Sequence, residues 1–387
     1  MPLPRHLRAT LATAMAILSV GCGGGGGDDG AVTTSTPPPA AQAPAPAAAD
    51  ALTYDGQTLS GRLMVPNSLG QFDLYDLATG ASRVLGDYDA DVWWEAGRSP
   101  DTVVRYDMNV VSGPKVRVTL IDTTTWAPKG LELLIPPRIS SPKLSADGKY
   151  LLAMWGDAAT DAERYNNPMT FIEVSTGRVV KRDWTLIKDE FTGIIGAPAD
   201  WLPDNGYVFL DGRKLYRATL GAAVPTLVAT LSLEDNLSTG GASSDFVDLT
   251  ASPDGRRIAF TWNGHIWVAG VDGSNLHRVT ALAPEDTFGP AFGSPAWSPD
   301  SQWLAGVLNR GGTNVAPVFP GSGDIAPPYQ VIGTSGCASP VFVVRADGPA
   351  ATVTWPRWPA EAGVRARNAK GQLIGVSSCD GQVFWIP

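Results

Sequence analysis

One short motif returns at nearly regular intervals along this chain of 387 residues: a Ser or Leu, then Pro or Ala, then Asp. Its copies begin at Ser99, Ser145, Leu202, Ser252 and Ser298, at intervals of 46, 57, 50 and 46 residues. Self-similarity at a fixed period indicates a repeat architecture, and a period of roughly 40–50 residues matches one four-stranded blade of a β-propeller.

The clearest copy, Ser252–Thr280, has the local signals of a blade. Pro253–Gly255 supplies a tight turn, because Pro fixes its own φ and Gly accepts a positive φ. Apolar residues alternate from Ile258 to Trp262, which predicts a strand with one buried face. A third apolar run and the turn pair Asp272-Gly273 follow. Each unit therefore predicts several antiparallel strands joined by short turns.

Composition supports an all-β fold. Gly and Pro number 43 and 32, and charged residues make up only 17%, below the roughly 25% of an ordinary soluble domain. Turns are thus abundant, and long amphipathic helices are not expected. Residues 51–387 divided by about 48 residues per blade predict a β-propeller of seven four-stranded blades, with six as the alternative. Residues 52–86, and the segments 373–377 and 382–386, resemble partial blades that close a monomeric ring without a free sheet edge.

The repeats resemble the PD40 (WD40-like) repeats of the TolB family of periplasmic propellers, over most of residues 95–310. The copy at 252–280 is a close match and those at 99, 145 and 202 are loose. The resemblance implies the propeller fold. TolB proteins carry a folded α/β domain before the propeller, whereas only a Gly/Pro-rich stretch precedes it here. Docking on TolA is therefore not expected of this chain.

The N-terminus reads as an export signal. Arg5 and Arg8 precede an apolar run, Ala9–Val20, that is too short to span a bilayer. The run ends at Leu18–Cys22, which resembles the lipobox of bacterial lipoproteins, where the Cys thiol receives a diacylglyceryl group. The resemblance implies a signal peptide over 1–21, lipidation of Cys22, and an outer-membrane location facing the periplasm or the cell surface of a Gram-negative bacterium. The alternative is an ordinary cleaved signal peptide.

Residues 22–50, rich in Gly, Pro and Ala, cannot form a buried core and predict a disordered tether. Removal of 1–21 leaves 27 basic and 38 acidic residues, a net charge of −11. This charge argues against a nucleic-acid partner and indicates that lipid, not an anionic protein surface, supplies membrane attachment.

The remaining cysteines, Cys337 and Cys379, form a candidate disulfide, because an exported chain is in an oxidising compartment. The alternative is two free thiols. Asp87, Asp89 and Asp91, with Glu95, resemble a calcium loop. The sixth position holds Val92 where that loop requires Gly, so a solvated acidic loop is the preferred interpretation and calcium the weaker one.

No catalytic residue is predicted, and no cofactor. Of three histidines, His265 and His277 lie within the same repeat and are assigned to packing or a strand surface, and no hydrolase elbow, zinc motif or phosphate loop occurs. The Asp of the repeat is assigned to turn formation. Trp201 and Trp297 share one repeat position and are predicted core residues. Four other tryptophans break the pattern and are candidate partner contacts: Trp93, Trp94, Trp355 and Trp358.

These features favour a lipid-anchored, non-catalytic propeller that binds a protein or an envelope polymer. The alternative is a propeller enzyme of the envelope, a glycan lyase or hydrolase. The resemblance to PD40 repeats also includes enzymes, and these use His-rich metal sites or an added hydrolase domain. Neither feature is evident in this sequence.

Overall fold

The chain divides into two units, Met1–Ala47 and Ala48–Pro387, and every residue described by the computed structural model belongs to the second. Cys22 and the predicted signal peptide lie outside the described residues. The structure describes residues 53–54, 57–67, 71–87, 92–96, 99, 101–107, 116–130, 132–135, 140–154, 169–183, 199–234, 248–282, 290–310, 339–353, 364–367, 373–378 and 382–387.

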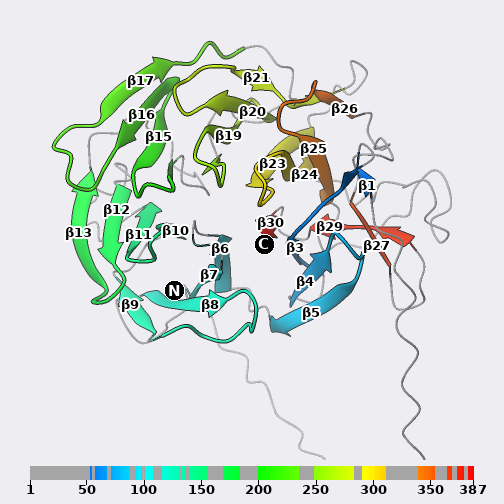
Figure 1. Ribbon diagram of the computed structural model, residues 1–387, viewed down its shortest axis with the longest axis horizontal. Coiled ribbons are helices and arrows are strands. Elements are labelled where there is room, and N and C mark those ends of the chain that lie inside the picture. The colour runs from blue at the N-terminus through cyan, green and yellow to red at the C-terminus, as the bar shows by residue number, and fades with distance from the viewer. Residues whose placement is uncertain are drawn as a thin grey trace, which may run out of the picture. The chain divides into compact units, whose positions relative to one another are not determined.

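The described residues of this second unit form six four-stranded antiparallel sheets around a common axis, which makes it a β-propeller (Figure 1). From the axis outward, the first three blades are β30 (Phe384–Ile386), β3 (Arg62–Pro66), β4 (Gln71–Asp76), β5 (Ser82–Asp87); β6 (Val92–Ala96), β7 (Thr102–Asp107), β8 (Val116–Asp122), β9 (Leu133–Ile135); and β10 (Ser140–Leu144), β11 (Tyr150–Met154), β12 (Met169–Glu173), β13 (Arg178–Asp183). The other three are β14 (Ala199–Trp201), β15 (Tyr207–Asp211), β16 (Lys214–Ala218), β17 (Thr226–Thr230); β18 (Leu249–Ala251), β19 (Arg257–Trp262), β20 (His265–Gly270), β21 (His277–Arg278); and β23 (Pro290–Trp297), β24 (Trp303–Arg310), β25 (Ser339–Arg345), β29 (Ser377–Ser378).

The all-β propeller is confirmed, and the preferred count of seven blades is wrong. The innermost strands contact one another in sequence, from β6 through β10, β14, β18, β23 and β30 back to β6, so the described residues leave no gap for a seventh blade. Dividing the length by a constant period overestimated the number of blades, because many residues lie in segments between strands. Residues 311–338 alone separate β24 from β25.

Ring closure joins the two ends of the propeller, as the partial blades predicted. The C-terminal β30 pairs with β3 in the register Leu63↔Trp385 and becomes the innermost strand of the blade β30–β3–β4–β5. Arg62 strengthens this junction, because its guanidinium donates to the carbonyl of Pro387 from Nε at 2.9 Å and to that of Thr123 from Nη1 at 2.8 Å. Three segments of chain from two neighbouring blades, the two ends of the propeller and the end of β8, thus meet at one arginine.

One strand pair links two blades directly. After β25 the chain does not add the fourth strand to its own blade but runs into β26 (Ala351–Val353), which pairs in parallel with β22 (Thr280–Leu282), at the end of the preceding blade. The fourth position is filled later by β29. Two short hairpins complete the described strands: β1 (Thr53–Tyr54) with β2 (Gln57–Thr58), and β27 (Arg365–Arg367) with β28 (Leu373–Gly375).

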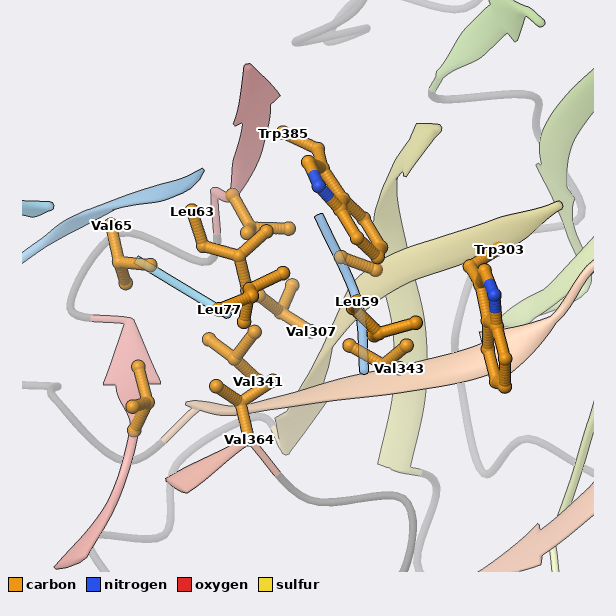
Figure 2. Packing of buried hydrophobic residues seen from close by; sticks show 13 residues of the cluster. Leu59, Leu63, Val65, Leu77, Trp303, Val307, Val341, Val343, Val364 and Trp385 are labelled. Atoms are coloured by element: carbon orange, nitrogen blue, oxygen red, sulfur yellow. The ribbon is translucent and has the colours of Figure 1, made fainter. Parts of the chain in front are cut away.

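The cores lie between neighbouring blades. One cluster joins β24 and β25 to β3 and β30, and it includes Leu63, Val341, Trp303 and Trp385 (Figure 2). Strands in such positions are buried on both faces, and every residue of β20 is buried. The low charged fraction follows from this double burial. The described part of the chain has no helix long and apolar enough to cross a bilayer.

Candidate functional site

The Asp of the repeat builds the turn between the first two strands of a blade. Asp254 Oδ1 accepts from Ser252 Oγ at 2.5 Å and from the Arg256 N–H at 3.0 Å. The same pair of contacts occurs at Asp147 and at Asp300. The structure therefore places these carboxylates in turns, as the sequence predicted.

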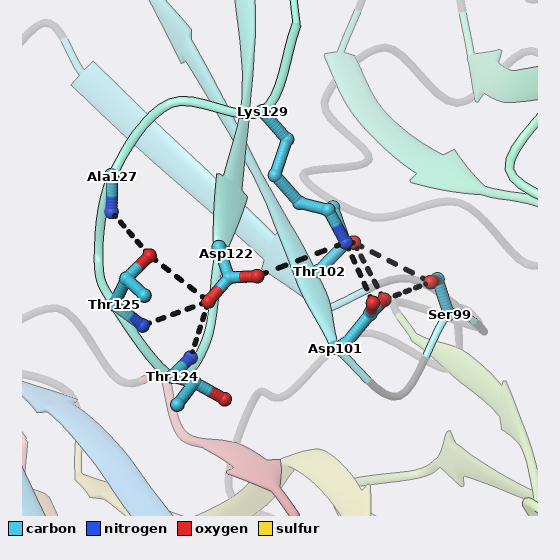
Figure 3. A network of polar contacts seen from close by, with 8 residues as sticks. All are labelled: Ser99, Asp101, Thr102, Asp122, Thr124, Thr125, Ala127 and Lys129. Carbon is cyan, nitrogen blue, oxygen red and sulfur yellow. Dashed lines mark hydrogen bonds and ion pairs between the residues drawn. The ribbon is translucent and has the colours of Figure 1, made fainter.

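The turn at Asp101 carries an additional cation (Figure 3). Lys129 Nζ lies 2.7 Å from Asp101 Oδ2 and 3.9 Å from Asp122 Oδ2. Hydrogen bonds from Lys129, Ser99 and Thr102 hold the pKa of Asp101 well below its usual range. The network ties the β7 turn to the end of β8, and because it is exposed we assign it to local order.

Turns of successive blades also touch each other around the ring. The Asp147 N–H donates to Asn205 Oδ1 of the next blade at 3.1 Å, and the Asp254 N–H donates to Ser301 Oγ at 3.1 Å. At Gly255 the contact is steric, because a Cβ there would lie 2.6 Å from Pro203 Cδ of the preceding blade. The turns thus form an interlocked rim.

Inside this rim lies an axial cavity of about 370 Å³. The innermost strand of each blade contributes one residue to the cavity lining. In every blade this residue stands opposite a fully buried residue of the second strand, so the six residues lie at the same level and form a layer across the cavity. We call them the axial ring: Glu95, Lys143, Asp200, Thr250, Ala296 and Phe384. The cavity extends to the turns, where it is lined by Ala146, Pro203, Pro253, Pro299 and Pro387.

The axial ring is chemically divided. Glu95, Lys143 and Asp200 come from three consecutive blades, and the neutral Thr250, Ala296 and Phe384 from the other three. The axial ring therefore has charge on one side and the neutral side chains of Thr250, Ala296 and Phe384 on the other. A ligand that fits both sides has a polar edge and an apolar face.

The two most buried charges are held by backbone groups. Lys143, 8% exposed, donates from Nζ to the carbonyls of Ala199 at 3.1 Å and Leu249 at 2.7 Å. Asp200, 1% exposed, accepts from the N–H groups of Trp201 at 2.8 Å and Ala251 at 2.9 Å. Both side chains thereby hold β14 to its neighbouring innermost strands.

A further carboxylate, Asp248, lies just before β18 and also lines the cavity. It is half-buried, and its Oδ2 accepts from the Ser294 N–H at 3.3 Å. Burial raises the pKa of Asp248, while the positive charge of Lys143 and the Ser294 hydrogen bond lower it. Among the described residues no group of three His, Cys, Asp or Glu side chains could hold a metal ion.

Several predicted site residues lie outside the described part of the chain. These are Cys22, Cys337, Cys379, Asp89, Asp91, Trp355 and Trp358, together with the side chains of Asp87 and Trp93. Trp94 is described: it is half-buried and packs edge-on against Phe72, with ring centroids 5.5 Å apart. Glu95, the fourth member of the calcium candidate, belongs to the axial ring.

Both described histidines have packing positions, as predicted. His265 is 3% exposed, and its ring centroid lies 5.6 Å from that of Phe292. Burial lowers the pKa of His265 to about 4. His277 lies at hydrogen-bond distance from the carbonyls of Asn275 and Ala346.

Sequence reasoning missed the axial ring, although part of its signal was present. Lys143, Asp200, Thr250 and Ala296 each stand two residues before the start of the repeat motif. The triplet Trp385-Ile386-Pro387 also matches Trp201-Leu202-Pro203, which would have placed Phe384 in the same layer. Glu95 does not follow this spacing, because it stands four residues before Ser99 and not two. The pairing of β6 with β7 ends at Ala96↔Val103, farther from the motif than in the other blades.

Comparisons with known proteins found similar structures only. A scan against models of protein families and a search of curated proteins each found no match. A solved structure described as TolB from Agrobacterium tumefaciens is 15% identical, with 85% of this chain and 99% of that chain covered and a TM-score of 0.44. The periplasmic gluconolactonase PpgL of Pseudomonas aeruginosa is 15% identical, covered at 84% and 99%, with a TM-score of 0.45. A chain of a nidogen/laminin complex is 10% identical, covered at 85% and 99%, also with a TM-score of 0.45. Likeness at this level of identity transfers no activity, ligand or partner to this chain.

Proposed function

We propose that this chain is a non-catalytic binding scaffold of the bacterial cell envelope. A lipid on Cys22 holds it at the outer membrane, and the tether of residues 22–50 gives the propeller reach. The propeller binds a protein or an envelope polymer at the axial cavity. The observation that carries the proposal is the axial ring, a divided layer of charged and neutral residues in a cavity that extends to the rim of turns.

The bonding of the charged residues favours binding over catalysis. A general acid or base must exchange a proton with a substrate within hydrogen-bond reach. Lys143 and Asp200 are instead committed to backbone carbonyl and N–H groups. Groups fixed in this way make a preorganised polar wall, which suits the recognition of a partner group more than proton transfer.

Photo-crosslinking in cells tests the proposal. A photoreactive amino acid is placed at Ala146, which lines the cavity, and as a control at Ser175, an exposed turn residue near the outer edge of the same blade. We expect a discrete adduct from position 146 and none from 175. Equal capture at both positions, or turnover of an envelope glycan or peptide by the purified chain, would overturn a non-catalytic axial site.

The lipid anchor is tested separately. Cys22→Ser is expected to release the chain from the membrane fraction without changing its melting temperature. Unchanged membrane association of this variant would refute attachment through Cys22 and leave the axial site untouched.

A further inference from the structure

The outer edge of the blade β14–β17 carries an exposed apolar corner. Residues 218–233 contain no charged side chain, and they form the turn between β16 and β17 and then β17 itself. Val224 in the turn is 76% exposed and Leu227 in β17 is 50% exposed. We call this segment the outer corner; β17 lies on the outside of the ring (Figure 1).

Two of the other outer strands place a charge next to their exposed aliphatic residue, whereas β9 holds the exposed Leu134 between Leu133 and Ile135. Arg83 precedes the exposed Val84 in β5, and Lys181 follows the exposed Val180 in β13. Charged residues on edge strands are the usual defence against unwanted association. The outer corner has no charged residue along its whole length. An exposed apolar segment of this kind indicates a surface that another molecule covers.

The corner is rigidly supported from behind. Leu227 stands opposite Tyr216 in the sheet, and Tyr216 stacks on the buried Phe209 with ring centroids 5.0 Å apart. Lys181 Nζ of the neighbouring blade donates to the Ala222 carbonyl at 3.3 Å. The apolar side chains are therefore presented by a fixed surface.

We propose that the outer corner docks on a lipid surface, with Val224 and Leu227 inserted at the boundary of headgroups and acyl chains. A stable protein dimer buries roughly 800 Å² per partner, more than one turn and one five-residue strand provide. Interfacial insertion requires only a few apolar side chains beside cations. Lys214 is exposed on the same sheet face as Tyr216 and suits anionic headgroups.

The attraction of headgroups is modest, because carboxylates stand near the cations. Asp211 is opposite Lys214, and Arg217 is paired with Asp204 at 2.5 Å. The apolar side chains therefore contribute most of the affinity. The net charge of −11 that remains without residues 1–21 opposes anionic lipid, so this contact is local to the outer corner and adds to the attachment that the lipid on Cys22 supplies. It is independent of the axial site.

Vesicle sedimentation tests it with the full chain carrying Cys22→Ser, so that no acyl anchor contributes. The probes are vesicles of phosphatidylcholine alone or mixed with phosphatidylglycerol. We expect Val224→Asp/Leu227→Asp to lower partitioning onto both vesicles at least about tenfold, since the variant loses the apolar burial of both side chains. Lys214→Gln should lower it about fivefold on the anionic vesicles only.

Val84→Asp is the matched control, an exposed valine of an outer strand on another blade, and it should bind like the parent. Absence of parent binding to both vesicles, or an equal loss in the control, would overturn the proposal. Concentration-dependent self-association that Val224→Asp/Leu227→Asp abolishes would identify a second copy as the occupant and also overturn it. Thermal melting of each variant confirms that the fold is retained.

Discussion

Gly148 and Gly255 occupy the same position of the repeat turn, with φ of +71° and +69°, yet their surroundings differ. A Cβ at Gly148 would meet nothing within 4 Å, whereas one at Gly255 would overlap Pro203 of the preceding blade. We expect Gly148→Ala to cost about 1 kcal/mol for the left-handed backbone, and Gly255→Ala about 2–4 kcal/mol because overpacking is added. Urea unfolding of both variants measures the difference, and equal losses would disprove the steric interlock of turns.

His265 makes stability depend on pH. Its pKa falls from 6.5 to about 4 on folding, because burial disfavours the imidazolium and Arg278 repels it. A base with a depressed folded pKa stabilises the protein above pH 6.5, and the contribution is lost as pH falls from 6.5 towards 4. We expect up to about 3 kcal/mol of this loss to come from His265. His265→Gln, compared with the parent by urea unfolding at pH 7 and pH 4.5, should show a smaller pH dependence; an identical dependence would contradict the assignment.

Lys143 illustrates how one residue joins several strands. Lys143→Met leaves the carbonyls of Ala199 and Leu249 without their donor, and unsatisfied buried groups cost about 1–3 kcal/mol each. We therefore expect the free energy of unfolding to fall by about 2–4 kcal/mol. The control is Lys149→Met, whose side chain is 71% exposed beside Asp147, and which should change stability by less than about 1 kcal/mol. A small loss in Lys143→Met would mean that water replaces the amine.

At the scale of elements, the turn chemistry was predictable and the strand exchange was not. Ser-Pro-Asp-Gly prescribes its own hydrogen bonds over four residues, so the turn at Ser252 could be predicted from local sequence. The pairing of β26 with β22 joins residues about 70 positions apart and has no local pattern. Three-residue strands such as Ala351–Val353 have no periodicity from which a partner could be inferred.

At the scale of the whole molecule, the period of the motif was sufficient to predict a propeller. The candidate site could not be predicted in this way, because its residues come together only in the closed ring. A blade is defined by contiguous residues, so its repeat is visible in the sequence. The axial ring assembles one residue from each of six blades, and the chemistry of the layer depends on which residues share it. Lys143 reaches Leu249, two blades away around the axis. Only the number of blades and the register bring such residues together, and an error of one blade changes every neighbour.

The closing strand is expected to decide whether the ring folds at all. Deletion of residues 382–387 removes β30 and exposes two inter-blade cores, because Trp385 belongs to one and Phe384 and Ile386 to the other. Loss of a buried Trp or Phe alone costs about 3–5 kcal/mol, so the sum approaches the whole stability of a typical domain, about 5–15 kcal/mol. We expect the truncated chain to lose its cooperative urea transition, followed by tryptophan fluorescence. Arg62→Ala, which removes the guanidinium contacts to Pro387 and Thr123 but leaves β30 in place, is the control and should lose about 1–3 kcal/mol with cooperativity kept. A truncated chain that still unfolds in one sharp transition would show that five complete blades and a three-stranded sixth suffice, and that closure by β30 is dispensable.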